Sequence, residues 1–217
     1  MTEVKELIEK ELFKSRMNGI SIFPYIGDTS TLEKIGNEIG IEHLKKIISD
    51  NDFFQVARSS TQVIPRFLYK FIELFVTDLK VSNIYEPWLT RESYSIVENF
   101  RQFKGITTNQ NEYELLKQGL LIDLDKITLG DSIENIDTEK DKYDLIVSFP
   151  PFGMRSINPN SISRDYATDL FIKSLDRLNE NGKLMFLMSP KFLYDKKIKQ
   201  IIAKSNISID GVFYLEE

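Results

Sequence analysis

The sequence predicts an α/β protein with a mostly parallel, doubly wound sheet. From residue 81 onward, short apolar runs rich in β-branched residues alternate with helical patterns, an order typical of a parallel sheet covered by helices. One run, Leu145-Ile146-Val147, is separated by two residues from Pro150-Pro151. Because proline has no N–H and a fixed φ, the chain must leave the sheet there in an extended form. Ligands bind at such strand ends in open α/β sheets, so we expect a site there.

The elements of this part can be assigned in chain order. The strands are expected at 81–85, 104–108, 126–129, 143–147, 183–188 and 209–215. The intervening helices are expected at 93–100, 111–121, 168–178 and 192–204. Asn181-Gly182 has the composition of a helix stop and is expected to terminate the third of these helices.

The first 80 residues have mainly helical patterns. Helices are expected at 2–17, 32–40, 41–48 and 61–79. The last is the clearest, because apolar side chains recur at helical spacing from Ile64 to Leu79 and Pro65 falls in its first turn. We therefore divide the chain into a helical extension, residues 1–59, and an α/β domain, residues 60–217.

Composition excludes several classes of protein. The chain has 217 residues, 41% of them hydrophobic and 28% charged, which is ordinary for a soluble globular protein. It has no cysteine and one histidine, His43, so disulfides, thiolate metal sites and histidine-based sites are not expected. The charged N-terminus is unlike a signal peptide, and no apolar stretch approaches the ~20 residues that span a bilayer. These features favour a cytoplasmic protein without a membrane partner and without a bound metal.

Residues 144–153, Asp-Leu-Ile-Val-Ser-Phe-Pro-Pro-Phe-Gly, resemble the catalytic motif of amino-group DNA methyltransferases, Asn/Asp/Ser-Pro-Pro-aromatic. The flanking pattern is most similar to the adenine-specific modification subunits of type I restriction systems. The resemblance implies a Rossmann-like, S-adenosylmethionine-dependent fold that acts on an adenine flipped out of DNA. It assigns the catalytic motif to Phe149, Pro150, Pro151 and Phe152, with the ring of Phe152 stacking on the base.

The first position of this motif departs from the family pattern. There a polar side chain, together with a backbone carbonyl, accepts hydrogen bonds from the exocyclic amine of the base. Here the position is Phe149, and a phenyl ring accepts no such bond. Ser148 precedes it by one residue and is expected to point to the opposite face of the strand.

The cofactor motifs of the family match in part. The loop Asp-Pro-x-x-Gly-x-Gly is represented by Glu86 and Pro87, but Thr90 and Glu92 replace its glycines. Glycines there allow the backbone to approach the cofactor closely, so side chains are expected to obstruct that pocket.

Three further residues correspond to cofactor contacts in the family. Thr107 ends the second strand, where the family has an acid that binds the ribose, and Asp131 ends the third, where an acid contacts adenine. Asp131 has the alternative of a turn or helix-cap aspartate. Thr61 loosely matches a helix that lines the cofactor pocket, with a core-packing helix as the equal alternative.

The resemblance continues through 167–171, 178–184 and 189–193. Between them, the polar segment 154–165 corresponds to a loop that faces DNA in the family; a plain surface loop is the alternative. The family sheet ends in an antiparallel seventh strand, and the sequence ends before one, so we expect the domain to lack it.

Three functional hypotheses follow. The favoured one is a catalytically impaired methyltransferase fold that binds DNA, or the specificity or restriction subunits of a restriction–modification complex. The net charge of −5 suggests that DNA binding by this chain alone is weak. One alternative is an active adenine methyltransferase, and the other is an unrelated α/β domain that binds a nucleotide or a protein. The active enzyme would require S-adenosylmethionine, whereas the impaired protein would require no cofactor.

Overall fold

The computed structural model of the chain describes residues 81–89, 102–108, 126–205 and 207–214, together with eight single positions before residue 120. The expected helices at 2–17, 41–48 and 93–100 and the residues Thr61, Thr90 and Glu92 fall outside the described residues. Of the expected extension 1–59, the structure describes only Asn37, which is helical as expected for 32–40, and Gly40. Within the helices expected at 61–79 and 111–121, the described positions Leu68, Phe71, Ile72, Leu74 and Tyr113 are helical.

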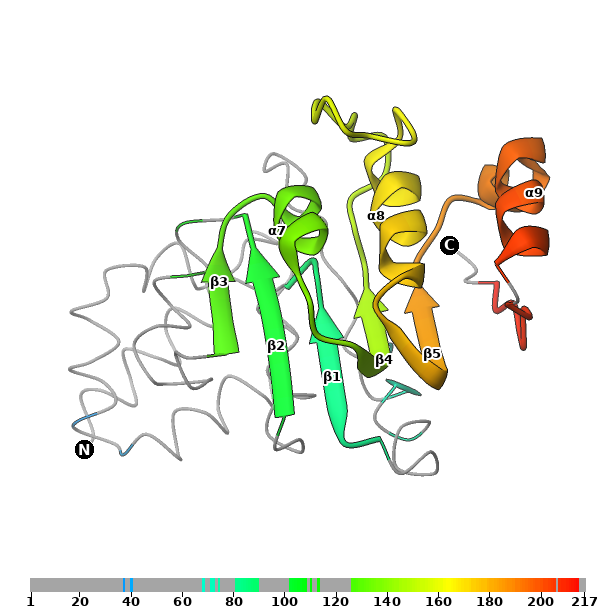
Figure 1. Cartoon of the computed structure of the whole chain (residues 1–217). Helices are drawn as coiled ribbons and strands as arrows, with labels where there is room; N and C mark the ends of the chain where they lie inside the picture. The colour runs from blue at the N-terminus through cyan, green and yellow to red at the C-terminus, as the bar shows by residue number, and fades with distance from the viewer. Residues whose placement is uncertain are drawn as a thin grey trace, which may run out of the picture.

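Five parallel strands form the sheet of the described region (Figure 1). They are β1 (Asn83–Glu86), β2 (Gln102–Thr107), β3 (Ile127–Leu129), β4 (Tyr143–Ser148) and β5 (Leu178–Phe186). Their order across the sheet is β3-β2-β1-β4-β5. The chain therefore moves outward from β1 to β3 and then crosses back to β4, which makes the boundary between β1 and β4 a topological switch point. Ligands of doubly wound sheets bind at this point, outside the carboxyl ends of the strands.

Two helices cover one face of this sheet, α7 (Ser132–Thr138) and α8 (Tyr166–Leu175) (Figure 1). Their apolar side chains and those of the strands form one buried cluster, made of Tyr85, Ile106, Ile133, Ile136, Tyr143, Ile146, Tyr166 and Leu170. Within it the rings of Tyr85 and Tyr143 stack at 4.7 Å between centroids. Each such fully buried side chain contributes roughly 1.5–3 kcal/mol of transfer free energy, so this cluster is what holds α7 and α8 on the sheet.

The doubly wound parallel sheet is confirmed, but the prediction at the start of β5 is wrong. Helix α8 ends at Leu175, and Asn181-Gly182 lies inside β5 rather than ending the helix. The pairing with β4 jumps from Tyr143↔Leu178 to Leu145↔Lys183, which is a bulge. Asn181 adopts a φ of 64°, and a Cβ on Gly182 would lie 2.9 Å from the carbonyl oxygen of Tyr143. The Asn-Gly pair is therefore used for a bulge.

The helices after β3 and β5 also differ from expectation. Helix α7 was not predicted, and the single helix expected at 192–204 is a 3-10 helix, η4 (Pro190–Tyr194), followed by α9 (Lys196–Lys204). Asp195 separates the two, because its Oδ1 accepts hydrogen bonds from the backbone N–H groups of Lys197 and Ile198 at 2.7 and 3.2 Å. It acts as an N-cap, which begins a new helix.

The sixth strand expected at 209–215 is not present in the described residues, since 207–214 contains no strand. Ser208 Oγ donates to Asp210 Oδ1 at 3.0 Å, and Asp210 forms an ion pair with Lys183 of β5. These local polar contacts compete with strand pairing, and Gly211 further weakens a strand there. Ile209, Phe213 and Tyr214 remain exposed. Among the helices that the structure describes, none has the length and apolar character needed to cross a bilayer.

Candidate functional site

Four of the residues singled out in the sequence meet at the carboxyl edge of the sheet. Glu86 and Thr107 end β1 and β2, while Asp131 and Phe149 closely follow the ends of β3 and β4. The strand order places them along the edge in the sequence Asp131, Thr107, Glu86, Phe149. Backbone hydrogen bonds link neighbouring ends, among them Gly130 N to Thr107 O at 3.0 Å. Glu86 and Phe149 flank the switch point between β1 and β4.

Asp131 is the N-cap of α7. Its Oδ1 accepts hydrogen bonds from the backbone N–H groups of Ile133 and Glu134 at 2.9 and 3.0 Å. Its Oδ2 accepts one from the hydroxyl of Tyr166 at 3.4 Å. The structure therefore has Asp131 as a helix cap, which was the alternative to a cofactor contact. Because an ionised carboxylate offers about four acceptor positions, the same group retains capacity for a ligand.

The turn after β1 folds back over β2. The backbone N–H of Leu89 donates to the carbonyl oxygen of Ile106 at 2.7 Å, and the side chain of Leu89 is buried against Gly105. Glu86 and Pro87 are buried, as is Thr107. In this conformation Glu86 and Thr107 present almost no surface to a nucleoside.

Two aromatic residues, Trp88 and Tyr166, connect the ends of different strands, and neither was singled out from the sequence. The ring of Trp88 meets that of Tyr166 edge to face at 5.4 Å between centroids. Tyr166, in the first turn of α8, thereby contacts both the turn after β1 and Asp131. Burial raises the pKa of Tyr166, so its hydroxyl remains a hydrogen-bond donor at neutral pH. Asp165, which caps α8 just before Tyr166, is the sequence signal that could have located this residue.

The Pro-Pro-Phe segment has one buried end and one exposed end. Phe149 is only 5% exposed and Pro150 is buried, whereas half of the surface of Phe152 is exposed. The hydroxyl of Ser148 is buried and has no hydrogen-bond partner among the described residues. The structure thus directs a phenyl ring, Phe152, outward at the end of β4 and keeps the side chains of Ser148 and Phe149 inside.

The segment from Met154 to Asp165 forms a defined loop on α8. Its two arms pair through an antiparallel bridge between Arg155 and Asp165, and Ser156 N donates to Arg164 O at 2.9 Å. The buried carboxylate of Asp169 on α8 accepts hydrogen bonds from three groups of the loop: Ile162 N at 2.7 Å, Ser156 Oγ at 3.1 Å and Ser163 N at 3.3 Å. One buried side chain therefore shapes the loop that follows Phe152.

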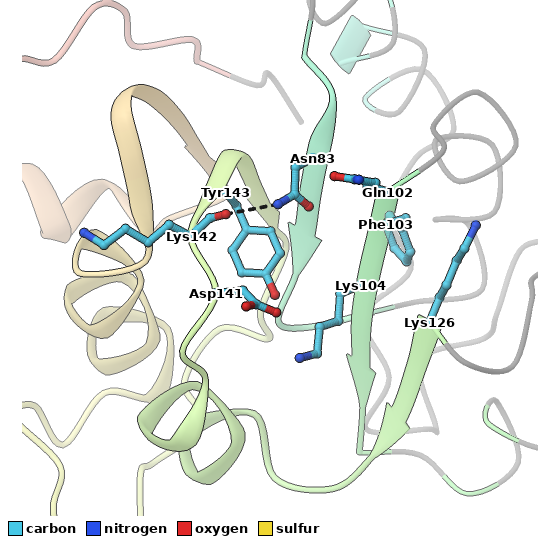
Figure 2. Close-up of a pocket in the computed structure, with 8 residues that line it drawn as sticks. All are labelled: Asn83, Gln102, Phe103, Lys104, Lys126, Asp141, Lys142 and Tyr143. Atoms are coloured by element: carbon cyan, nitrogen blue, oxygen red, sulfur yellow. Dashed lines mark hydrogen bonds between the residues drawn. The ribbon is translucent and has the colours of Figure 1, made fainter.

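A depression also opens at the opposite edge of the sheet, where the strands begin (Figure 2). It is lined by Asn83, Gln102, Phe103, Lys104, Lys126, Asp141, Lys142 and Tyr143. The side chain of Asn83 crosses it to donate to the carbonyl oxygen of Lys142 at 3.0 Å (Figure 2). The depression is separated from the carboxyl edge by the length of the strands and contains none of the residues expected to form the site.

The strand order, the switch point and the Pro-Pro-Phe segment at the end of β4 define a Rossmann-like fold of the kind found in S-adenosylmethionine-dependent methyltransferases. Residues 107–214 match the model of the family described as the methyltransferase small domain. The chain therefore contains a methyltransferase-like domain, and the alternative of an unrelated α/β domain is set aside.

One solved structure with a TM-score above 0.5 has a similar fold, and two further structures are less similar. A Listeria monocytogenes protein assigned to the class I S-adenosylmethionine-dependent methyltransferases superposes with a TM-score of 0.58 at 16% identity, covering 94% of this chain and 79% of its own. The type I restriction enzyme EcoKI M protein has a TM-score of 0.47 at 15% identity, with 89% of this chain covered and 47% of that one. A Staphylococcus aureus protein assigned as a caffeoyl-CoA O-methyltransferase has a TM-score of 0.42 at 16% identity, with 82% of this chain and 85% of that one covered. Comparison with curated protein sequences gives no match.

Proposed function

We propose that this chain is a catalytically impaired relative of the adenine-specific DNA methyltransferases, which binds DNA or partner subunits without transferring a methyl group. The observation that carries the proposal is the position of Phe149. It occupies the place where the amine of the target base would need a hydrogen-bond acceptor, and it is a buried phenyl ring, 5% exposed.

The polar side chain that precedes Phe149 in the sequence, Ser148, does not supply that acceptor. The hydroxyl of Ser148 is buried on β4, while the backbone oxygen of Ser148 accepts from Leu187 N at 3.0 Å within the sheet. Removing one hydrogen bond that stabilises a transition state typically lowers the rate by ~10²–10³. A loss of this kind would strongly impair methyl transfer.

The cofactor side of the edge supports the same proposal. A bound nucleoside would need surface on Glu86 and Thr107, and both are buried. Leu89 packs against Gly105 beside them. The residues as arranged do not fit S-adenosylmethionine, and the cofactor would have to displace the turn after β1.

The proposed partners follow from the motif. Residues 144–153 resemble the modification subunits of type I restriction systems, and Phe152 exposes half of its surface to stack on an unpaired base. Because the chain carries a net charge of −5, tight DNA binding would require a second subunit, such as a specificity or restriction subunit. This assembly would be cytoplasmic.

A second candidate, an active methyltransferase, is favoured by a different observation. Asp131, Thr107 and Glu86 lie at three adjacent strand ends in the order that a bound nucleoside requires. Asp131 keeps acceptor capacity despite its role as a cap.

Calorimetric titration of S-adenosylmethionine separates the two candidates. We expect no heat of binding at cofactor concentrations of about 1 mM, which corresponds to a binding free energy weaker than about −4 kcal/mol. Micromolar binding would contradict the impaired assignment. Methyl transfer to adenine-containing oligonucleotides is then measured for the wild type, for Phe149→Asn, and for Phe149→Leu as the control without an acceptor. Activity of the wild type would overturn the proposal.

A further inference from the structure

We propose that the loop Met154–Asp165 and the segment of η4 and α9, residues 190–204, form one surface that binds single-stranded DNA. We call it the loop–α9 surface. The proposal rests on the proposed function in taking DNA as the partner, and it adds the site and the form of DNA that is bound. The carbonyl oxygen of Ile162 in the loop accepts a hydrogen bond from Lys197 Nζ of α9 at 2.8 Å, so the two parts are directly joined.

The two parts are also anchored to the same helix. Phe171 of α8 packs against Phe192 of η4 at 4.8 Å and against Phe186 of β5 at 5.5 Å between ring centroids. Asp169, two residues earlier on α8, holds the loop through three hydrogen bonds. In Figure 1 the loop stands above the carboxyl edge of the sheet, and α9 lies beyond β5. A ligand would therefore meet a preformed surface next to Phe152.

Charge on this part of the chain is opposite to that of the whole. Residues 151–204 contain ten Lys and Arg against five Asp and Glu, a net charge of +5, whereas the full chain has −5. Three of those five acids are engaged by backbone N–H groups: Asp165 caps α8, Asp195 caps α9, and Asp169 is buried beneath the loop. The exposed cations of the loop–α9 surface are Arg155, Arg164, Lys191, Lys196, Lys197, Lys199 and Lys204. They form a locally positive field that suits a phosphate backbone.

Apolar and aromatic side chains stand exposed among these cations. Ile157 at the loop is 94% exposed, and Tyr194 at the end of η4 is 75% exposed. Lys199 Nζ lies 6.0 Å from the centre of the Tyr194 ring. Aromatic rings interleaved with cations are typical of surfaces that stack unpaired bases while contacting the backbone. A duplex offers no free base faces, so the combination favours a single strand.

Fluorescence anisotropy with a labelled 20-nucleotide single strand and with the matching duplex tests the proposal on the full chain. We expect the single strand to bind more tightly than the duplex. Replacing three cations, in Lys191→Gln/Lys196→Gln/Lys199→Gln, should weaken binding about tenfold and lower the salt dependence of log K by about two. The matched control removes three lysines near the opposite edge of the sheet, in Lys126→Gln/Lys140→Gln/Lys142→Gln, and should leave binding nearly unchanged.

A second pair of variants tests stacking. Tyr194→Ala should weaken single-strand binding about fivefold or more, and Tyr194→Phe should retain it. Equal losses in the two triple-lysine variants would show that net charge alone drives binding and would overturn the proposal, as would duplex binding as tight as that of the single strand. Absence of binding to either oligonucleotide would overturn it too. None of these results depends on S-adenosylmethionine, so a failure here is separate from the calorimetric test of the proposed function.

Discussion

The side chain of Leu89 packs against Gly105 so closely that a Cβ on Gly105 would lie 3.0 Å from Leu89 Cδ1. The same Cβ would lie 2.9 Å from the ring of Phe103. Leu89 is also bonded through its backbone N–H to Ile106, so the turn after β1 is attached to β2 by both backbone and side chain. Leu89 and Glu86, at the two ends of this turn, are both buried.

Gly105→Ala should therefore destabilise the fold by about 1–3 kcal/mol, because an added methyl group overpacks the contact with Leu89 and Phe103. Urea denaturation measures the change. Leu89→Ala should cost about 2–5 kcal/mol through the cavity it creates. In the double variant the new methyl group has space, so the loss should be smaller than the two single losses combined. Strict additivity would show that the two side chains do not interact.

Asp144 should make stability depend on pH at the acid end. Hydrogen bonds from the Asn179 side chain at 2.7 Å and from Ser82 Oγ at 2.7 Å hold the pKa of this carboxyl below its usual range. A lowered pKa in the folded state contributes stability above the unfolded value, and this contribution is lost as the pH falls through the folded value.

We expect Asp144→Asn to lower the free energy of unfolding by about 1 kcal/mol at pH 7, since the site is partly exposed to solvent. The gap between variant and wild type should close as the pH is lowered from 5 toward 2. Urea denaturation at a series of pH values checks this. Asp176→Asn, an exposed position after α8, serves as the control and should follow the wild type.

Asp169→Ala should release the loop Met154–Asp165 while leaving the sheet intact. The substitution leaves the N–H groups of Ile162 and Ser163 without their acceptor, which costs about 1–3 kcal/mol. Limited trypsin digestion should cleave faster at Arg155 and Arg164. Asp165→Ala, which removes only the cap of α8, is the comparison; identical cleavage rates in both variants would refute the anchoring role of Asp169.

Asp131→Ala should destabilise α7 by about 1 kcal/mol through loss of its N-cap, measured by thermal or urea denaturation. Asp131→Asn should retain most of this stability, because an amide oxygen can still accept from Ile133 and Glu134. A large loss in the Asn variant would instead point to the negative charge as the stabilising feature.

Several features could be predicted from local sequence alone. The apolar runs that became β1 to β4 are correct within about two residues, because buried parallel strands need continuous apolar segments. The Pro-Pro-Phe segment follows β4 as expected, since proline cannot continue a central strand. Helix α7 was missed because its apolar residues, Ile133 and Ile136, span less than one turn and show no periodicity.

Other features depend on contacts between distant parts of the chain. An Asn-Gly pair suits a helix end and a bulge equally well, and the pairing of Tyr143 with Leu178 decides for the bulge. The edge-to-face contact of Trp88 with Tyr166 has no local signal, because the two residues belong to different elements and meet only when α8 docks on the sheet. The sequence places the candidate residues at the carboxyl edge of the sheet, where the structure also has them, but the burial of Glu86 and Phe149 could not be predicted.

The support of an exposed loop by one carboxylate on a neighbouring helix has an evolutionary consequence. Asp169 holds the loop mainly through backbone N–H groups, and Ser156 and Asn158 add side-chain hydrogen bonds within it, whereas exposed side chains such as that of Ile157 contribute little to its shape. Substitutions there can change what is recognised while the scaffold persists. Homologues are therefore expected to diversify fastest at these positions, and selection experiments that seek a new binding preference can randomise them at little risk to folding.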